Sequence, residues 1–343
     1  MKQPRLIRKC RSAIFYTKNA WRRSCERRAF GLRRRHVENW LSSLSNSNCE
    51  VLVGANFVEF GGCRQHMHSI VRHSRLNADL APAERLMQKV PARVFDHQFI
   101  EEFQRLELPR LKAVHSHVFP WFIHWCEQHR RKTGVRWVHT HHNWYYPEFA
   151  REELEPWQIE FNEGFKFALE NADVGLVVSK SQQKFLRESF DLKSTYLPNG
   201  VDVALCDEGN PARCRKQTGL NNFILYAGRN DPVKNPADFV RLAQRLPNHQ
   251  FLMVGQGLSN AVMQTEWNVA VPENLKIQGE ATPLEIQDAI AACLALVVTS
   301  KREGLPTLVM ESMAHSKPTI VPEEEGCMEV IGHGDFGFIY RQG

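Results

Sequence analysis

The stretch from Ala291 to Val321 constrains the fold more than any other part of the chain. A nearly all-apolar run, Ala291–Thr299, predicts a buried parallel strand. After a short glycine-containing loop, Pro306 stands where a first helical residue would, with its φ already set. The predicted helix runs to about His315 and stops before the next proline, because the residue before a proline avoids the α region. A second apolar strand, Thr319–Val321, follows at once, so the stretch predicts a right-handed unit of a parallel sheet.

The loop inside this unit is a candidate ligand site. It lies at the carboxyl end of a strand, where open α/β sheets bind their ligands. The N–H groups of Gly304 and Leu305 and the first helical turn favour an anion. Two carboxylates, Glu303 and Glu311, bracket the turn. This combination suits a ligand with phosphate and hydroxyl groups, such as a nucleotide sugar, and the alternative is an ordinary loop with two solvated glutamates.

Length and charge divide the chain into parts. The 343 residues are enough for two domains. The formal net charge of +6 is uneven, because residues 1–35 hold 13 Lys and Arg and one acid, whereas the remainder is mildly acidic. The mean hydropathy of −0.41 argues against a membrane span. The nine cysteines are scattered without a C-x-x-C pair, which predicts free thiols in a reducing compartment, so a cytoplasmic location is expected.

Residues 1–48 are predicted to form a basic N-terminal extension. Three interpretations stay open: a solvated extension, a surface that docks on anionic lipid at the inner face of a membrane, and a nucleic-acid contact. The lipid interpretation would make the protein peripheral to the membrane through residues 1–40. The acidic remainder of the chain argues against nucleic acid as a partner.

Residues 49–205 alternate between strand and helix patterns, which predicts a doubly wound first domain. A glycine pair, Gly61-Gly62, opens the first helix and lets a ligand approach the backbone. Ser179 is predicted to cap a helix through Phe190, and the Asn199-Gly200 turn is predicted to need positive φ.

Five histidines stand at two predicted strand ends in the first domain, but they do not predict a metal site. Neither a carboxylate nor a cysteine stands at a ligand spacing nearby. A histidine at such an end is better suited to bond a hydroxyl or phosphate of a substrate. The five residues are His115, His117, His139, His141 and His142.

The second predicted domain, 221–343, follows a polar segment at 206–220 that is expected to be a linker. Arg229 and Lys234 follow the domain's first strand, as Glu303 follows a later one. Carboxyl ends of parallel strands meet at one edge of a sheet, so both cations are expected beside the 303–311 loop. Two cations next to a helix N-terminus predict a diphosphate site, and surface cations on a loop are the alternative.

Taken together, these motifs resemble family 4 of the retaining glycosyltransferases, which have the GT-B fold. The resemblance covers about Glu50 to Tyr340. It is carried by A-G-R-x-x-x-x-K, by G-x-G, and by S-x-x-E-G-L-P-x-x-x-x-E-S-M-A-x-x-K-P, whose glutamates match the E-x7-E signature. P-N-G-V-D, F-G-G and T-H-H-N add to it, the last placing the active-site histidine at His142. The resemblance implies two Rossmann-like domains facing across a cleft, an acceptor domain followed by a donor domain.

The resemblance also implies a role for each matching residue. Arg229 and Lys234 hold the donor diphosphate, while Glu303 and the backbone of Gly304, Leu305 and Pro306 hold the donor sugar. The remaining implied roles are ribose binding by Glu311, contact with diphosphate and acceptor at Gly61 and Gly62, and contact with the sugar at His142.

The activity implied is hexosyl-type transfer from a nucleotide diphosphate sugar to an acceptor hydroxyl, with retained configuration and without a metal or other cofactor. A glycan or lipid-linked acceptor, as in cell-surface polysaccharide or glycolipid synthesis, is expected. The alternative is a non-catalytic module that binds nucleotide sugars or glycans. The nucleotide, sugar, linkage and oligomeric state are not predicted.

Two departures from the family pattern matter. Ser316 replaces a glycine that is common before Lys-Pro. The family pattern also continues beyond F-G-F-I-Y, so the second domain is expected to be C-terminally truncated, with an incomplete outer layer and exposed apolar surface.

Overall fold

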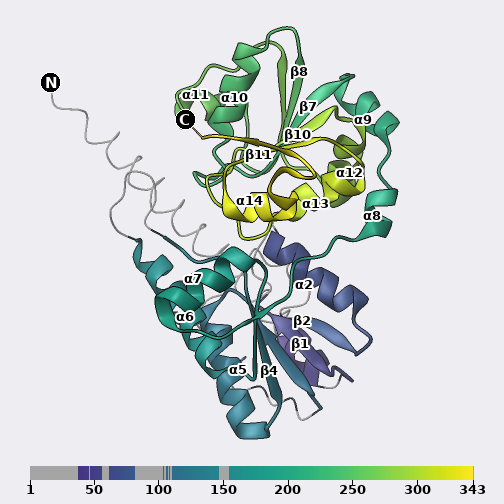
Figure 1. The fold of residues 1–343 in the computed structure, drawn as a ribbon. Coiled ribbons are helices and arrows are strands. Elements are labelled where there is room, and N and C mark those ends of the chain that lie inside the picture. The colour runs from purple at the N-terminus through teal and green to yellow at the C-terminus, as the bar shows by residue number, and fades with distance from the viewer. Residues whose placement is uncertain are drawn as a thin grey trace, which may run out of the picture. The chain divides into compact units, whose positions relative to one another are not determined.

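The computed structural model describes residues 38–45, 47–55, 62–81, 103, 106, 108, 110–146 and 154–342. These residues form two six-stranded sheets (Figure 1). The neighbouring strands whose residue pairing the structure defines run parallel to each other. The predicted pair of α/β Rossmann-like domains is therefore confirmed. Most of the predicted basic extension, as well as Gly61, lies outside the described residues.

The chain divides into two compact units, Met1–Trp137 and Val138–Gly343. The first sheet has the order β2-β1-β3-β4-β5-β6. The second unit holds the later strands of this sheet as well as all of the second sheet. The predicted domain limits remain a prediction.

The elements of the first sheet follow the expected alternation of strand and helix. Its strands are β1 (Val51–Gly54), β2 (Ala78–Ala81), β3 (Ala113–Ser116), β4 (Arg136–His141), β5 (Val174–Val177) and β6 (Thr195–Tyr196). Its helices are α2 (Gly62–His73), α5 (Pro120–Thr133), α6 (Pro156–Asn171) and α7 (Lys180–Phe190). Helix α7 has the bounds that the sequence predicts, because the Ser179 hydroxyl accepts the Gln182 N–H as an N-cap.

Residues 38–45, at the end of the predicted basic extension, are helical and not a solvated tail. The side chains of Trp40 and Leu44 are only 3% and 2% exposed. The Trp40 ring stacks on Phe103 with ring centroids 6.0 Å apart. This segment therefore packs as part of the first unit.

The second sheet has the order β12-β11-β10-β7-β8-β9. Its strands are β7 (Phe223–Ala227), β8 (Gln250–Val254), β9 (Leu275–Gln278), β10 (Ala295–Val297), β11 (Thr319–Pro322) and β12 (Phe338–Tyr340). The helices of this part are α8 (Val203–Asp207), α9 (Pro211–Thr218), α10 (Pro236–Arg245), α11 (Asn260–Thr265), α12 (Pro283–Ala292), α13 (Thr307–Ala314) and α14 (Glu325–Val330), and a 3-10 turn spans Gly332–Gly334.

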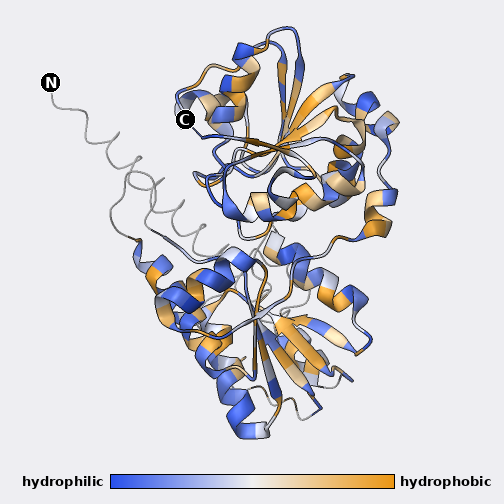
Figure 2. Cartoon of the chain, in the orientation of Figure 1, coloured by the Kyte–Doolittle hydropathy of each residue, from blue (hydrophilic) through white to orange (hydrophobic). Residues whose placement is uncertain are grey.

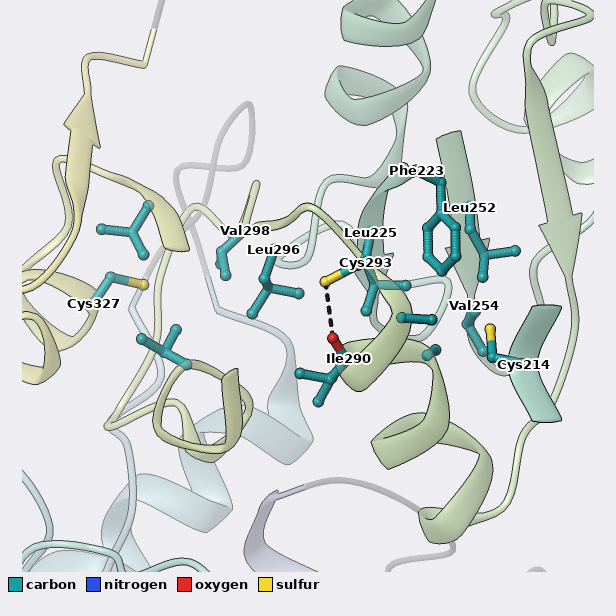
Figure 3. Close-up of a cluster of buried hydrophobic side chains, with 14 of the residues drawn as sticks. Cys214, Phe223, Leu225, Leu252, Val254, Ile290, Cys293, Leu296, Val298 and Cys327 are labelled. Atoms are coloured by element: carbon teal, nitrogen blue, oxygen red, sulfur yellow. Dashed lines mark hydrogen bonds between the residues drawn. The ribbon is translucent and has the colours of Figure 1, made fainter. Parts of the chain in front are cut away.

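Alternate residues along each central strand enter two separate cores, as the period of two in a strand requires. Phe223, Leu225 and Leu252 pack with residues of α12, α13 and α14 on one face (Figure 3). Tyr226 and Phe251 pack with residues of α10 and α11 on the other face. Figure 2 shows hydrophobic colouring along much of the strands at the centre of this sheet.

The expectation of an incomplete outer layer is thus wrong for the sheet faces, since helices cover both. Exposed apolar surface is nevertheless present at the edge strand β12 and the turn before it. There the side chains of Phe336 and Phe338 are 68% and 64% exposed.

Three local predictions are wrong. The segment 206–220 is not a plain linker, because it contains the end of α8 and the whole of α9, which is capped by Asn210 and closed by Gly219. The predicted strand Ala291–Thr299 begins inside α12, and only Ala295–Val297 is strand. Neither residue of the Asn199-Gly200 turn has a positive φ.

Candidate functional site

The loop after β7 is fixed against the end of β10. The Thr299 hydroxyl bonds to the carbonyl oxygens of Lys234 and Asn235, at 3.0 and 2.9 Å. The N–H of Lys301 donates to the Val233 carbonyl at 2.7 Å. These bonds place Lys234 beside the loop that carries Glu303, as the shared sheet edge predicts.

An ion pair joins the two loops. Lys234 Nζ lies 2.5 Å from Glu303 Oε1, and their side chains are 29% and 12% exposed. Arg229 behaves differently, since its guanidinium pairs with Asp231 at 2.8 Å and its side chain is 46% exposed. The structure therefore joins Lys234 to Glu303, whereas the recorded ion pair of Arg229 is with a neighbour in its own loop.

Helix α13 starts one residue later than predicted. Pro306 occupies the N-cap position and not the first helical turn, and the helix ends at Ala314. The first N–H groups of a helix have no partner within it, so the start of α13 can donate to an anion. Leu305 is held from another loop, because Asn199 Nδ2 donates to its carbonyl at 2.9 Å. This bond, and not a positive φ, explains the asparagine in P-N-G-V-D.

Glu311, the second glutamate of the signature, lies on α13. The amide Nε2 of Gln287 on α12 donates to Glu311 Oε2 at 2.8 Å. Burial raises the pKa of Glu311, and the Gln287 hydrogen bond opposes this shift. The structure shows no direct bond of Glu311 to Arg229, Lys234 or Glu303 among the described residues.

The backbone around Glu303 is packed closely against the start of α14. A Cβ at Gly326 would lie 2.5 Å from the Gly304 carbonyl oxygen and 2.6 Å from that of Glu303. The carboxylate of Glu324 caps α14 by accepting the Cys327 N–H at 2.9 Å, and it also accepts a backbone hydrogen bond from Glu303. Burial nevertheless raises the pKa of Glu324. Sequence reasoning missed Glu324, because glutamate is not among the residue types that usually occupy a helix N-cap.

His142 follows β4 in the same unit. A Cβ at Gly304 would lie 2.2 Å from the His142 carbonyl oxygen, so only glycine fits there. The neighbouring His141 is buried, and burial lowers its pKa to about 4. Gly62 is the first residue of α2 in the other unit, and Gly61 lies outside the described residues.

The segment after His142 is pinned by two buried amides. Gln182 on α7 accepts the Trp144 N–H at 3.2 Å and lies 3.4 Å from His141 Nε2. Asn162 on α6 bonds both the N–H and the carbonyl of Tyr145, at 2.9 and 2.7 Å. The polar strand end that carries the predicted histidine is therefore a fixed element.

Two family models match the chain. The model described as Glycosyltransferase Family 4 matches residues 34–205, and that described as Glycosyl transferases group 1 matches residues 213–343. The chain belongs to glycosyltransferase family 4. The second model covers every residue of the Lys234–Glu303 and Glu311 sites, whereas the first covers His142. The structural elements that carry the family motifs are thus the same ones that form the ion pair.

Several known proteins are similar in sequence to this chain. The chain is 24% identical over 196 residues to N-acetyl-alpha-D-glucosaminyl L-malate synthase of Bacillus anthracis, covering 53% of this chain and 50% of that protein. It is 23% identical over 314 residues to D-inositol 3-phosphate glycosyltransferase of Acidothermus cellulolyticus, covering 76% and 67%. The chain spans about half the length of the first of these relatives.

A solved structure supports the fold. The Anabaena protein Alr3699/HepE, in a complex with UDP and glucose, superposes with a TM-score of 0.68 at 18% identity, covering 85% of both chains. The GT-B fold of this family is therefore the fold of the present chain. Among the described residues, no helix combines the length and apolar character that a bilayer span needs.

Proposed function

We propose that the chain transfers a hexosyl group from a nucleotide diphosphate sugar to an acceptor hydroxyl, with retention of anomeric configuration. The observation that carries the proposal is the Lys234–Glu303 pair, which sets a cation and a carboxylate side by side before the start of α13. The acceptor is proposed to be a glycan or a lipid-linked glycan of cell-surface synthesis.

The chemistry requires positive charge where the nucleotide diphosphate departs. An ammonium group has three donors, and Lys234 gives one to Glu303, so two remain for phosphate oxygens. Arg229 and the first N–H groups of α13 add further donors at the same loops. Groups fixed before the reaction stabilise charge that grows in the transition state. These protein groups are proposed to neutralise the leaving group without a metal ion.

The two signature glutamates are proposed to divide the recognition of the donor. Glu303 accepts hydrogen bonds from hydroxyls of the transferred sugar, next to the cation that contacts the phosphate. Glu311 accepts them from the ribose. A double displacement would require a carboxylate nucleophile at the anomeric carbon. We assign no residue to that role, so departure and attack on one face of the sugar is the proposed path.

The test begins with binding. Calorimetry with UDP-, GDP- and ADP-sugars identifies the donor, with UDP-glucose first because the Anabaena neighbour was crystallised with UDP and glucose. The donor that binds is then incubated with glycan acceptors, and the anomeric configuration of the product is read by NMR. Retained configuration supports the proposal, and an inverted product overturns it. Donor binding without transfer or hydrolysis would instead identify a non-catalytic nucleotide-sugar-binding module.

A further inference from the structure

Glu311 belongs to a partly buried hydrogen-bonded chain that no family motif describes. Gln287 on α12 is 2% exposed and donates its amide Nε2 to Glu311 Oε2 at 2.8 Å. Its other amide atom, Oε1, lies 2.9 Å from Nε2 of His315, the C-cap residue of α13. One side chain of α12 therefore links the middle of α13 to its end.

The direction of this chain is fixed by chemistry. An ionised carboxylate only accepts hydrogen bonds, so the NH₂ of Gln287 and not its carbonyl must face Glu311. The carbonyl of Gln287 then faces His315, whose Nε2 must carry the proton to donate. Burial lowers the pKa of His315, and the neutral ring suffices for this bond. The order is His315 to Gln287 to Glu311, with each donor pointing toward the carboxylate.

The surrounding backbone holds the chain in place. A Cβ at Gly209 would lie 2.7 Å from His315 Cε1 and 2.9 Å from the main-chain carbonyl oxygen of Gln287. The turn between α8 and α9 therefore packs directly on both residues. Beside Gln287, the carboxylate of Asp288 accepts the Asn210 N–H at 2.7 Å. Helix α12 is thus tied to this turn at two successive residues. Gln287 has a fixed backbone from which its amide reaches Glu311.

We propose that Gln287 is a positioning residue that fixes Glu311 for a ribose diol and thereby sets the preference of the site for ribonucleotides. The inference rests on the proposed function, in which Glu311 receives the ribose. Because Gln287 occupies Oε2, the carboxylate cannot rotate freely and presents Oε1 to the ligand. The fixed orientation of the carboxylate should strengthen binding of a nucleotide with ribose hydroxyls and should not affect binding of a nucleotide that lacks them.

The experiment compares two ligands on one protein. Calorimetry measures the dissociation constants of UDP and of 2′,3′-dideoxy-UDP, or of the GDP or ADP pair if that nucleotide binds instead. A hydrogen bond to a charged group stabilises by about 1.5–3 kcal/mol, so the wild type is expected to prefer the ribonucleotide about 10–100-fold. Gln287→Met keeps the side-chain length and removes the amide. It is expected to lower this preference about 3–10-fold while binding of the dideoxy nucleotide changes little.

The chain offers a matched control. Gln217 on α9 also donates its amide to a glutamate of α12, Glu285, at 3.0 Å, but on an exposed surface. Gln217→Met should leave the ribonucleotide preference unchanged. If Gln287→Met does not fold, His315→Leu replaces it, with His315→Gln as the conservative variant that retains an N–H donor and the preference.

The outcomes separate the two hypotheses. A wild type that binds none of the three nucleoside diphosphates overturns the proposed function. A wild type that prefers ribose, with the same preference in Gln287→Met, leaves the proposed function standing and overturns the role of Gln287. Equal weakening of both ligands in that variant means that Gln287 only supports the fold, which also overturns it.

Discussion

Replacing Lys234 by methionine should change two quantities that can be measured separately, the free energy of unfolding and the rate of sugar transfer. The substitution keeps the length of the side chain and removes the ammonium group that contacts Glu303 Oε1 at 2.5 Å. The Glu303 side chain is only 12% exposed, so its carboxylate loses a charged donor where water compensates poorly. The perturbation therefore acts on folding through Glu303 and on turnover through the lost contact with the diphosphate.

The two effects have different sizes. Leaving one member of a fully buried ion pair alone costs about 3–5 kcal/mol, and exposed pairs contribute about 0–1 kcal/mol. Because Lys234 is 29% exposed, the expected loss of unfolding free energy is about 1–2 kcal/mol. Loss of one donor to transition-state charge lowers turnover about 10²–10³-fold.

The assay pairs the single variant with Lys234→Met/Glu303→Gln. Denaturant unfolding should show that the double variant recovers most of the lost stability, since no unpaired charge remains. Initial rates of sugar transfer should stay low in both. Lys276→Met is the control, because Lys276 Nζ donates to the Thr218 carbonyl at 2.7 Å on another part of the same sheet. Turnover of Lys234→Met within about threefold of the wild type would refute the assigned role.

Three further predictions concern the frame around the site. Gly255→Ala should lower the free energy of unfolding by about 3 kcal/mol, because the added Cβ would lie 1.8 Å from the Gly228 carbonyl oxygen. Gly279→Ala is the control: it has open space around it and should leave denaturant unfolding unchanged. Ser316→Gly should stabilise by about 1 kcal/mol, because Ser316 closes α13 with φ 55°, and a thermal midpoint no higher than that of the wild type would contradict this. Glu311→Gln should stabilise the folded protein at pH 7. Burial raises the folded-state pKa of Glu311 above 4.5, so the stability of the wild type falls as pH rises from 4.5 through that folded-state pKa. The gain of the variant over the wild type should therefore vanish below pH 4.5.

Helices with strong local signals could be predicted from the sequence. Ser179 caps α7 through its hydroxyl, and this helix ends at Phe190 as predicted. The polar composition of segment 206–220 predicts a linker and hides helix α9, because the helix has few apolar residues. Its local signals were nevertheless present, since Asn210 caps it and Pro211 begins it.

An apolar run without a Gly or Pro inside it gives no signal for the boundary between a helix and a strand. Ala291–Thr299 fits a buried helix end as well as a buried strand, and the boundary between α12 and β10 falls inside it. Periodicity cannot divide such a run. The helix ends at Ala292, its C-cap residue Cys293 is extended, and the strand begins at Ala295.

Some contacts of the candidate site could be predicted from the sequence and others could not. The meeting of Lys234 and Glu303 follows from sheet topology alone, because both residues come directly after strands of one parallel sheet. The partners of Arg229 and Glu311 do not follow from topology. Asp231 and Gln287 are chosen by side-chain rotamers and by helix packing, which no spacing in the sequence encodes.

The glycines explain why the loops meet with such narrow tolerances. A Cβ at Gly255 would strike the carbonyl of Gly228, and one at Gly326 would strike that of Gly304, so at both places two backbones touch directly. Contacts between backbones have few alternative arrangements, unlike contacts between long side chains. These contacts fix the loop after β7 against the loop after β8, and the loop after β10 against the loop after β11, while the Thr299 hydroxyl joins the two pairs. Lys234, Glu303 and the start of α13 can then act on a donor without the reorganisation that flexible loops would require.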